Sequence, residues 1–370
     1  MNYLFFSPMV WNNYRGRNVE LPVALAKNGN ACTYINPLNY RNGKNDAMRF
    51  RQLADHSQEK VKVIDRFSRL PKSIWMLFKE NRDNVRWVKK QKPDVVISFD
   101  HLMSISICLY CSRKKIPFIF DVMDDWEMIE KNSLVRFYYK HIVRPIIGRR
   151  AFAITSTSNR QAELFRKYNR NVHLIPNGKP FAFIQQATAF FTDGKKTVNF
   201  ISTLKDWYDF DLLFNVFAEF PDLQLNIYGE GELLDELKNK AQHFSNISIK
   251  GNVDSALLPR LTAESLFGIL PLKLNALNET TCPIKLFDYW SAKKAVIASP
   301  TGELKKVGLD GGMLFATSKA DYVAAISSLL KNRELMDSIG AKGYDKMLQK
   351  YNYDLLSQQF EKIVESNNLR

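Results

Sequence analysis

The sequence lacks the features that mark several large classes of protein. It has four cysteines in 370 residues, which is too few for a disulfide-rich scaffold. No apolar run approaches the roughly 18 residues that a membrane-spanning helix needs. The opening "MNYLFFSPMVW" has neither the basic segment nor the small-residue cleavage site of a signal peptide. We therefore expect a cytoplasmic protein whose first residues form a strand.

The cysteine spacing does not indicate a metal site. Cys108 and Cys111 form one C-x-x-C pair, but no second pair completes a zinc site. Both lie in the apolar stretch "SISICLYC". We expect them to be small buried residues on a helix.

Charge is distributed unevenly along the chain. Residues 1–180 carry 32 Lys and Arg against 15 Asp and Glu, a net charge of +17, whereas residues 181–370 carry 21 against 23, a net charge of −2. This asymmetry indicates that the first half faces a polyanion, either nucleic acid or an anionic membrane surface.

Short apolar runs alternate with helix-length polar or amphipathic segments, which predicts an α/β fold with parallel sheets. We expect two doubly wound Rossmann-like domains, residues 1–180 and 190–350, with the stretch from about 173 to 196 as their connection. The amphipathic segment 351–370 predicts a helix that packs on one of them, with the first as candidate. The strand-like runs are 3–6, 31–36, 61–65, 94–99, 117–122, 151–156, 197–202, 223–229, 246–251, 266–272, 295–299 and 312–317.

A G-x-G turn follows one predicted strand of the second half. Gly229 and Gly231 precede a clear helix, but position 234 is leucine, so the third glycine of a dinucleotide-binding fingerprint is missing. The motif therefore disfavours an NAD-dependent oxidoreductase. Two glycines still allow a ligand to approach the backbone closely, or they make only a tight turn.

The stretch "CPIKLFDYWSAKKAVIAS" (282–299) begins as a helix and ends in a strand-like run. Pro283 suits the first helical turn, and a helix N-terminus is a ready anion site. Lys285 adds a positive charge suited to a diphosphate, and Asp288 lies one turn further on the same face, where its carboxylate can accept hydrogen bonds from ribose hydroxyls. The alternative is an ordinary i,i+3 surface ion pair.

Several motifs occur in the order found in the GT-B glycosyltransferases. "PIKLFDYWSAKKAVIAS" resembles their P-x-K-(L/F)-x-E-Y segment, "LNIYGEGE" their I-G-x-G, "IKGNVDSALLPRL" their G-x-V-x-x-x-x-L-P-x-L, and "LIPNG" the I-P-N-G that closes the first domain. The resemblance is strongest to family-4-like bacterial enzymes of surface polysaccharide synthesis. It implies a nucleotide-sugar glycosyltransferase, with UDP favoured over GDP, that needs neither a bound metal nor a cofactor other than its co-substrate.

The resemblance also assigns roles in donor binding. It implies that Lys285 holds the diphosphate, that Asp288 holds the ribose and that backbone near Val253 faces the base. The other residues implied are Lys205, Gly229, Gly231, Thr281 and Ile284.

The sequence departs from the family pattern at two places. The family places two glutamates eight residues apart, but here the first position is Thr280, with Glu279 one residue off. Lys293 replaces a usual glycine.

Candidate catalytic residues lie in the first half. "FIFDVMDDWEMI" places Asp124 and Asp125 after a central strand, where a catalytic base belongs in such sheets. Asp124 is our first candidate for the base of an inverting transfer, and helix capping is the alternative role of both. His101 follows another strand, as a histidine does in retaining relatives. The sequence does not decide between the two stereochemical outcomes.

The excess positive charge has a candidate partner in an anionic membrane. The segments 73–92 and 134–150 interleave aromatic with basic residues, which is typical of an interfacial helix, although a solvated basic face is the alternative. Arg15 and Arg17 follow the first strand, in a loop that lines the acceptor side in the resembled fold, where they either bind an anionic acceptor or are solvated. The resemblance implies a lipid-linked saccharide or a polysaccharide as acceptor, which we expect at the inner membrane face.

Three other functions compete with this prediction. A nucleic-acid-binding protein fits the basic first half but not the near-neutral second half, so we expect no nucleic-acid partner. The oxidoreductase is disfavoured as described. A GT-B-like phosphorylase or epimerase that acts on soluble sugars stays open.

Overall fold

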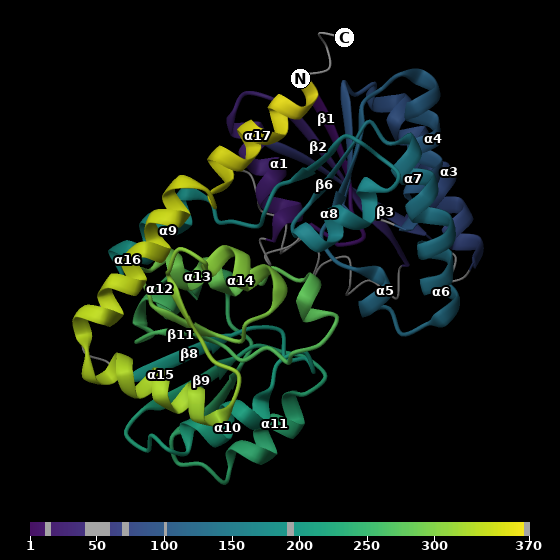
Figure 1. Cartoon of the computed structure of the whole chain (residues 1–370). Helices are drawn as coiled ribbons and strands as arrows, with labels where there is room; N and C mark the ends of the chain where they lie inside the picture. Colours follow the sequence, from purple (N-terminus) through teal and green to yellow (C-terminus); the bar gives the residue numbers. More distant parts are fainter. Residues whose placement is uncertain (12–15, 41–59, 69–73, 100–101, 191–195, 366–370) are drawn as a thin grey trace. The chain divides into compact units, whose positions relative to one another are not determined.

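The computed structural model describes residues 1–11, 16–40, 60–68, 74–99, 102–190 and 196–365 (Figure 1). The chain divides into two compact units. Unit 1 comprises Met1–Pro176 together with Leu356–Arg370, and unit 2 comprises Asn177–Leu355. Among the described residues, no helix has the length and apolar character needed to cross a membrane.

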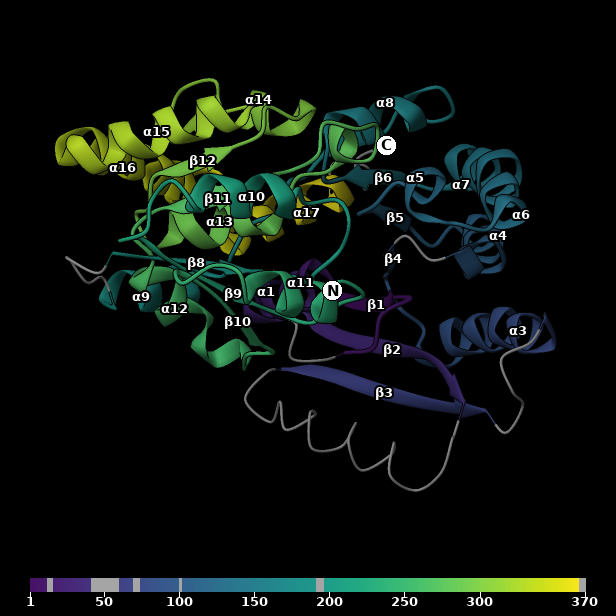
Figure 2. The same ribbon diagram turned by 90° about the horizontal axis from the view of Figure 1, so that it is seen from below.

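Unit 1 is built on a seven-stranded parallel sheet in the order β3-β2-β1-β4-β5-β6-β7. The direction of winding reverses between β1 and β4, so this pair is the switch point of a doubly wound sheet. Figure 2 shows β1, β2 and β3 side by side. The strands are β1 (Asn2–Phe6), β2 (Ala31–Tyr40), β3 (Val61–Ser68), β4 (Val95–Phe99), β5 (Phe118–Val122), β6 (Ala153–Ser156) and β7 (Val172–Leu174).

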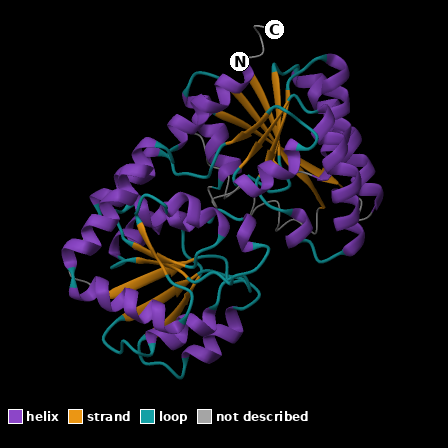
Figure 3. Cartoon of the chain, in the orientation of Figure 1, coloured by secondary structure: helices purple, strands orange, loops and turns teal. Residues whose placement is uncertain are grey.

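Helices flank the sheet of unit 1 on both sides (Figure 3). They are α1 (Arg17–Lys27), α3 (Ile74–Gln91), η1 (Leu102–Ser104), α4 (Ile105–Lys114), α5 (Trp126–Ile129), α6 (Ser133–Tyr138), the π-helical turn η2 (Tyr139–Val143), α7 (Arg144–Arg150), α8 (Asn159–Arg166) and α17 (Tyr353–Glu365). Side chains of α3, α4 and α7 form one hydrophobic cluster with alternate residues of β1, β4 and β5. Cys108 and Cys111 are free thiols buried in this cluster, which confirms the structural interpretation of the C-x-x-C pair.

Unit 2 contains two three-stranded parallel sheets, β10-β9-β8 and β11-β12-β13. The backbone N–H of Leu266 donates to the carbonyl of Thr197 at 2.7 Å, so β8 and β11 lie edge to edge and the winding reverses there. The strands are β8 (Thr197–Ile201), β9 (Gln224–Tyr228), β10 (Ile247–Gly251), β11 (Gly268–Leu270), β12 (Val296–Ala298) and β13 (Met313–Phe315).

The helices of unit 2 surround one large hydrophobic core that holds Trp290 and most of the buried phenylalanines of the unit. They are α9 (Phe181–Ala189), α10 (Phe210–Phe217), α11 (Leu234–Ala241), η3 (Ser255–Leu257), α12 (Leu258–Glu264), η4 (Asn278–Thr280), α13 (Ile284–Ser291), α14 (Gly302–Gly308), α15 (Lys319–Lys331) and α16 (Arg333–Gln349).

The expected connection at 173–196 differs from the structure. It begins inside β7, and residues 181–189 form α9, a helix that packs on unit 2 through Ile184 and Ala187. A single buried residue per turn gives α9 too little periodicity to be recognised in the sequence.

Helix α13 ends in a way that explains a departure from the family pattern. Lys293 has a φ of 56°, in the left-handed region that favours glycine. Its N–H donates to the carbonyl of Trp290 at 3.1 Å, and the N–H of Lys294 donates to that of Tyr289 at 3.0 Å. These two bonds form a Schellman motif, in which the family's usual glycine is replaced here by lysine.

Candidate functional site

The carboxyl ends of β8 and β11 in unit 2 are the place where a ligand is expected in such a sheet. The two loops that follow these strands are held together by backbone and amide bonds. The N–H of Asp209 donates to the carbonyl of Pro271 at 2.7 Å, and the side-chain amide of Asn278 donates to the carbonyl of Trp207 at 2.9 Å. Lys205 lies in the first of these loops, with its ammonium 5.0 Å from the centre of the Trp207 ring.

Helix α13 starts directly after the second loop. Its N-cap is Pro283, whose side chain makes no capping hydrogen bond. Lys285 and Asp288 lie on the same face as predicted, with the ammonium 3.4 Å from Oδ2 of the carboxylate. The Lys285 side chain is 25% exposed, whereas that of Asp288 is almost buried. Burial lowers the pKa of Lys285, and the charge of Asp288 opposes this effect.

The sequence prediction missed Lys179, which is the other partner of Asp288. Its ammonium forms an ion pair with Oδ1 of Asp288, and both side chains are almost completely buried. The ammonium also lies 4.6 Å from the centre of the Phe183 ring. Lys179 is the residue after the "LIPNG" motif, so the motif identified the segment but not the lysine.

Thr281 and Ile284 lie at the start of α13, on either side of its N-cap. The Thr281 hydroxyl donates to the carbonyl of Leu277 at 3.0 Å. Val253 follows the carboxyl end of β10, and its N–H donates to the side-chain oxygen of Asn252 at 2.9 Å. The donor roles of these residues stay predictions.

Gly229 and Gly231 follow β9, where their lack of a side chain has a structural use. At Gly229, with a φ of 139°, an added Cβ would overlap the carbonyl oxygen of Ser202, and one at Gly231 would overlap that of Leu204. The two glycines therefore make room for the loop that follows β8. Contact with a donor stays a prediction for both.

The position of the first family glutamate is occupied differently here. Thr280 is buried, and its hydroxyl donates to the carbonyl of Leu277 at 2.7 Å. Glu279 is exposed and lies against the start of α14, because a Cβ added to Gly302 would be 2.6 Å from its Oε2. Of the two, Glu279 therefore presents a carboxylate near the N-terminus of a helix.

Arg17 in unit 1 does not fit the predicted acceptor-side role. Its guanidinium is buried and binds Asp121 through two bonds, Nε to Oδ2 at 2.6 Å and Nη2 to Oδ1 at 2.9 Å. Nη1 donates to the carbonyl of Pro176 at 2.8 Å, and the hydroxyl of Thr155 donates to Asp121 at 2.5 Å. These contacts tie α1 to β5 and β6, so Arg17 has a structural role. Arg15 lies outside the described residues.

The two candidate catalytic aspartates in the loop after β5 differ in their exposure to solvent. Asp125 is buried and caps α5, accepting from the N–H of Glu127 at 3.0 Å, as the capping alternative predicted. Burial raises its pKa, partly offset by this bond and by Arg144, whose Nη2 lies 3.7 Å from Oδ1. Asp124 lies two residues after β5 and is exposed, and its role as the base stays a prediction. His101 lies outside the described residues.

Two sequence profiles of known families match the chain. The one described as Glycosyltransferase Family 4 matches residues 19–179, over most of unit 1. The one described as Glycosyl transferase-like matches residues 211–362, over most of unit 2. A sequence search of curated proteins found no match. The chain is a GT-B glycosyltransferase of the family-4 type.

Solved structures resemble this glycosyltransferase along nearly its whole length. Anabaena HepE in complex with UDP and glucose has 13% identity and a TM-score of 0.70, covering 99% of this chain and 100% of that one. Sucrose-phosphate synthase from Thermosynechococcus elongatus has 15% identity and a TM-score of 0.75, covering 99% of each chain. A variant of S. aureus TarM in complex with fondaparinux, alpha-GlcNAc-glycerol and UDP has 10% identity and a TM-score of 0.69, covering 98% and 100%. The predicted α/β fold with two Rossmann-like units is confirmed.

The two aromatic and basic segments of the glycosyltransferase differ in exposure. Trp87 of α3 packs partly buried against the core of unit 1. From α5 through η2, by contrast, four large apolar side chains are exposed, and we call them the apolar patch: Met128, Leu134, Phe137 and Ile142. Exposed basic residues interleave with them, namely Lys131, Arg136 and Lys140.

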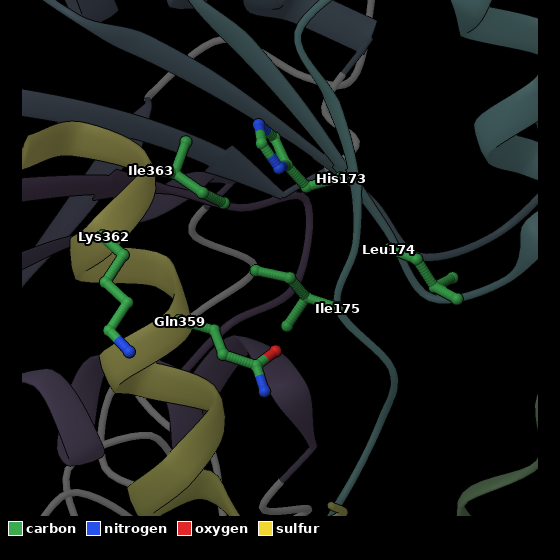
Figure 4. A pocket seen from close by; sticks show the side chains of 6 residues that line it. All are labelled: His173, Leu174, Ile175, Gln359, Lys362 and Ile363. Atoms are coloured by element: carbon green, nitrogen blue, oxygen red, sulfur yellow. The ribbon is translucent and has the colours of Figure 1, made fainter. Parts of the chain in front are cut away.

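A cavity of about 400 Å³ lies in unit 1 of the glycosyltransferase, between β7 and α17 (Figure 4). Burial lowers the pKa of His173 on its wall, and Nε2 of this ring lies 2.6 Å from Oδ1 of Asn171. None of the predicted site residues lines this cavity. Its lining consists of His173, Leu174, Ile175, Gln359, Lys362 and Ile363.

Proposed function

We propose that this glycosyltransferase transfers a sugar from a UDP-sugar to a lipid-linked saccharide acceptor at an anionic membrane surface. The observation that carries the proposal is the cluster that Lys179 forms with Asp288 and Lys285 of α13, because a partly exposed lysine beside a helix start suits a diphosphate. UDP is favoured because the structures of HepE and TarM, which share the fold, contain it.

In this proposal unit 2 binds the donor. Lys285 contacts the diphosphate, Asp288 faces the ribose and backbone near Val253 faces the base, with Lys205 as a second phosphate contact. Unit 1 binds the acceptor. The proposed place of action is the cytoplasmic face of the inner membrane, in polysaccharide biosynthesis.

Asp124 has the exposure and strand-end position of a general base. In an inverting transfer its carboxylate takes the proton of the acceptor hydroxyl while that oxygen bonds to the anomeric carbon. The bond from the anomeric carbon to the phosphate oxygen breaks, and UDP leaves with the electron pair, stabilised by Lys285 and the start of α13. A retaining transfer with His101 near the donor sugar is the alternative.

The membrane part of the proposal is supported by the apolar patch together with the net charge of +17 over residues 1–180. Exposed apolar side chains beside lysine and arginine suit the headgroup region of an anionic bilayer. A phosphorylase or epimerase of soluble sugars has no use for such a surface, so vesicle binding separates the two functions.

A thermal-shift panel of UDP, GDP and ADP tests the donor assignment. We expect UDP to raise the melting temperature most, and Lys285→Ala to remove that shift because the diphosphate loses its charged contact. Lys240→Ala is the matched control, since Lys240 also pairs with an aspartate, Asp211, and lies 5.6 Å from a phenylalanine ring. Absence of any nucleotide shift in the unmodified chain refutes the proposed donor.

A further inference from the structure

The carboxylate of Asp288 faces two lysines, one at each oxygen. Lys179 pairs with Oδ1, and the ammonium of Lys285 lies 3.4 Å from Oδ2. One negative charge cannot balance two positive ones, so the cluster keeps a net charge of +1. A buried excess charge of this kind is stabilised when an anion joins it.

The two lysines are held very differently. The N–H of Lys179 donates to the carbonyl of Tyr351 at 3.0 Å, and its carbonyl accepts from the N–H of Tyr353 at 3.0 Å. With its ammonium also packed against Phe183, the Lys179 side chain is only 8% exposed. Its charge is therefore fixed in place beside Asp288.

Lys285 is bound more loosely. Its 3.4 Å separation from Asp288 exceeds the roughly 2.7–2.9 Å of a strong charge-assisted hydrogen bond. Its side chain is 25% exposed, about three times the fraction of Lys179. The ammonium of Lys285 is thus the one that an anion can reach.

We propose that Lys179 is a positioning residue for donor binding: it is the permanent counter-ion of Asp288, and it thereby leaves Lys285 available to the donor diphosphate. This inference rests on the proposed function. If Lys179 is removed from this cluster, Lys285 is the lysine of the cluster that still pairs with the buried carboxylate of Asp288. The diphosphate then has to compete with Asp288 for that ammonium.

A double-mutant cycle on the full chain tests the inference, with UDP affinity measured by calorimetry. We expect Lys179→Met to raise the dissociation constant of UDP about tenfold. This corresponds to a loss of about 1.4 kcal/mol in binding free energy. Adding Asp288→Asn removes the competing carboxylate, and its amide oxygen still accepts from a ribose hydroxyl. The double variant is expected to bind UDP within about threefold of Asp288→Asn alone, because Lys179 then has no carboxylate left to neutralise.

The matched control is Lys346→Met. Lys346 is another partly buried lysine of unit 2, but its ammonium donates to the carbonyls of Val307 and Gly311, both at 2.8 Å, rather than to a carboxylate. We expect this variant to lower stability and leave UDP affinity unchanged. Equal weakening by Lys179→Met and Lys346→Met overturns the inference, because a general loss of packing then explains both.

The double variant still tests the inference if Lys179→Met does not fold. It replaces both members of a buried ion pair by neutral groups, so no unpaired charge stays buried. Weaker UDP binding by the double variant than by Asp288→Asn alone overturns the inference, since Lys179 then acts on the donor without the carboxylate. An unchanged UDP affinity in folded Lys179→Met overturns it as well.

A second measurement does not depend on UDP. The pKa of Lys285 is followed by NMR of methylated lysines, with Lys285→Arg identifying the signal. Lys179 repels the charge of Lys285 and so lowers its pKa, whereas Asp288 raises it. We expect Lys179→Met to raise the pKa of Lys285, and an unchanged value overturns the inference. If the unmodified chain does not bind UDP, the proposed donor fails while this measurement still tests the role of Lys179.

Discussion

Breaking the buried Arg17–Asp121 pair is expected to destabilise unit 1 strongly. Arg17→Met removes two charge-assisted bonds from the carboxylate of Asp121, which has no exposed surface and keeps its hydrogen bond from the hydroxyl of Thr155. Removing one member of a buried pair typically costs about 3–5 kcal/mol, because the other charge stays buried. The carbonyl of Pro176 also loses its donor.

This loss of free energy of unfolding can be expressed as a shift of the melting temperature. Unit 1 has about 190 residues, a size at which 1 kcal/mol shifts the midpoint by about 2–4 °C. Arg17→Met is therefore expected to lower the transition of unit 1 by about 6–20 °C. Arg160→Met is the control, since Arg160 and Glu163 form an exposed pair at 3.9 Å. Its change is expected to stay below about 1 kcal/mol.

Calorimetry and urea titration measure these shifts, and acceptor kinetics give the deciding comparison. If Arg17→Met leaves the melting temperature within about 1 °C but raises the acceptor KM, the structural assignment is wrong and Arg17 binds the acceptor after all. An Arg17→Met, Asp121→Leu double variant is expected to be more stable than Arg17→Met alone, because it no longer buries a charge without its partner.

Three further predictions concern other parts of the chain. Lys293→Gly should raise the free energy of unfolding of unit 2 by about 0.5–1 kcal/mol in urea titrations. Glycine adopts the left-handed conformation without the strain that lysine has there. This gain exceeds the loss caused by the greater conformational entropy of glycine in the unfolded chain. Asp124→Asn should lower kcat about 100-fold or more with UDP affinity unchanged, and a kcat within about threefold would favour the His101 alternative. Leu134→Glu with Phe137→Glu should lower binding to vesicles containing phosphatidylglycerol about tenfold or more in flotation assays, whereas Leu309→Glu, which alters an equally exposed leucine of unit 2, should not. Equal loss in both would contradict a specific role of the patch.

The strands were predictable because strands of a parallel sheet are buried on both faces and are therefore seen as apolar runs. Each of the twelve runs overlaps a strand, such as Val61–Ser68 at the run 61–65. The strand Val172–Leu174 was not predicted, since it lies at the sheet edge and none of its residues is buried. Helix Phe181–Ala189 was missed for the related reason that only two of its residues are buried.

The candidate site was predictable only where its residues are close in sequence. The pairing of Lys285 with Asp288 follows from helical spacing. Lys179 and Arg17 reach their carboxylates across long stretches of chain, and such contacts leave no periodic trace in one sequence. A buried lysine and an exposed one look alike in composition, so only the fold distinguishes the fixed Lys179 from the accessible Lys285.

The return of α17 to unit 1 has a consequence for how the chain folds during synthesis. Asn30 donates to Glu361 at 2.6 Å, and Leu356 and Phe360 are buried, so this last helix completes the N-terminal unit. Unit 2 is in effect an insertion within unit 1. Residues 177–355 can complete their fold while the ribosome still holds the segment that unit 1 needs, which reverses the usual N-terminal-first order.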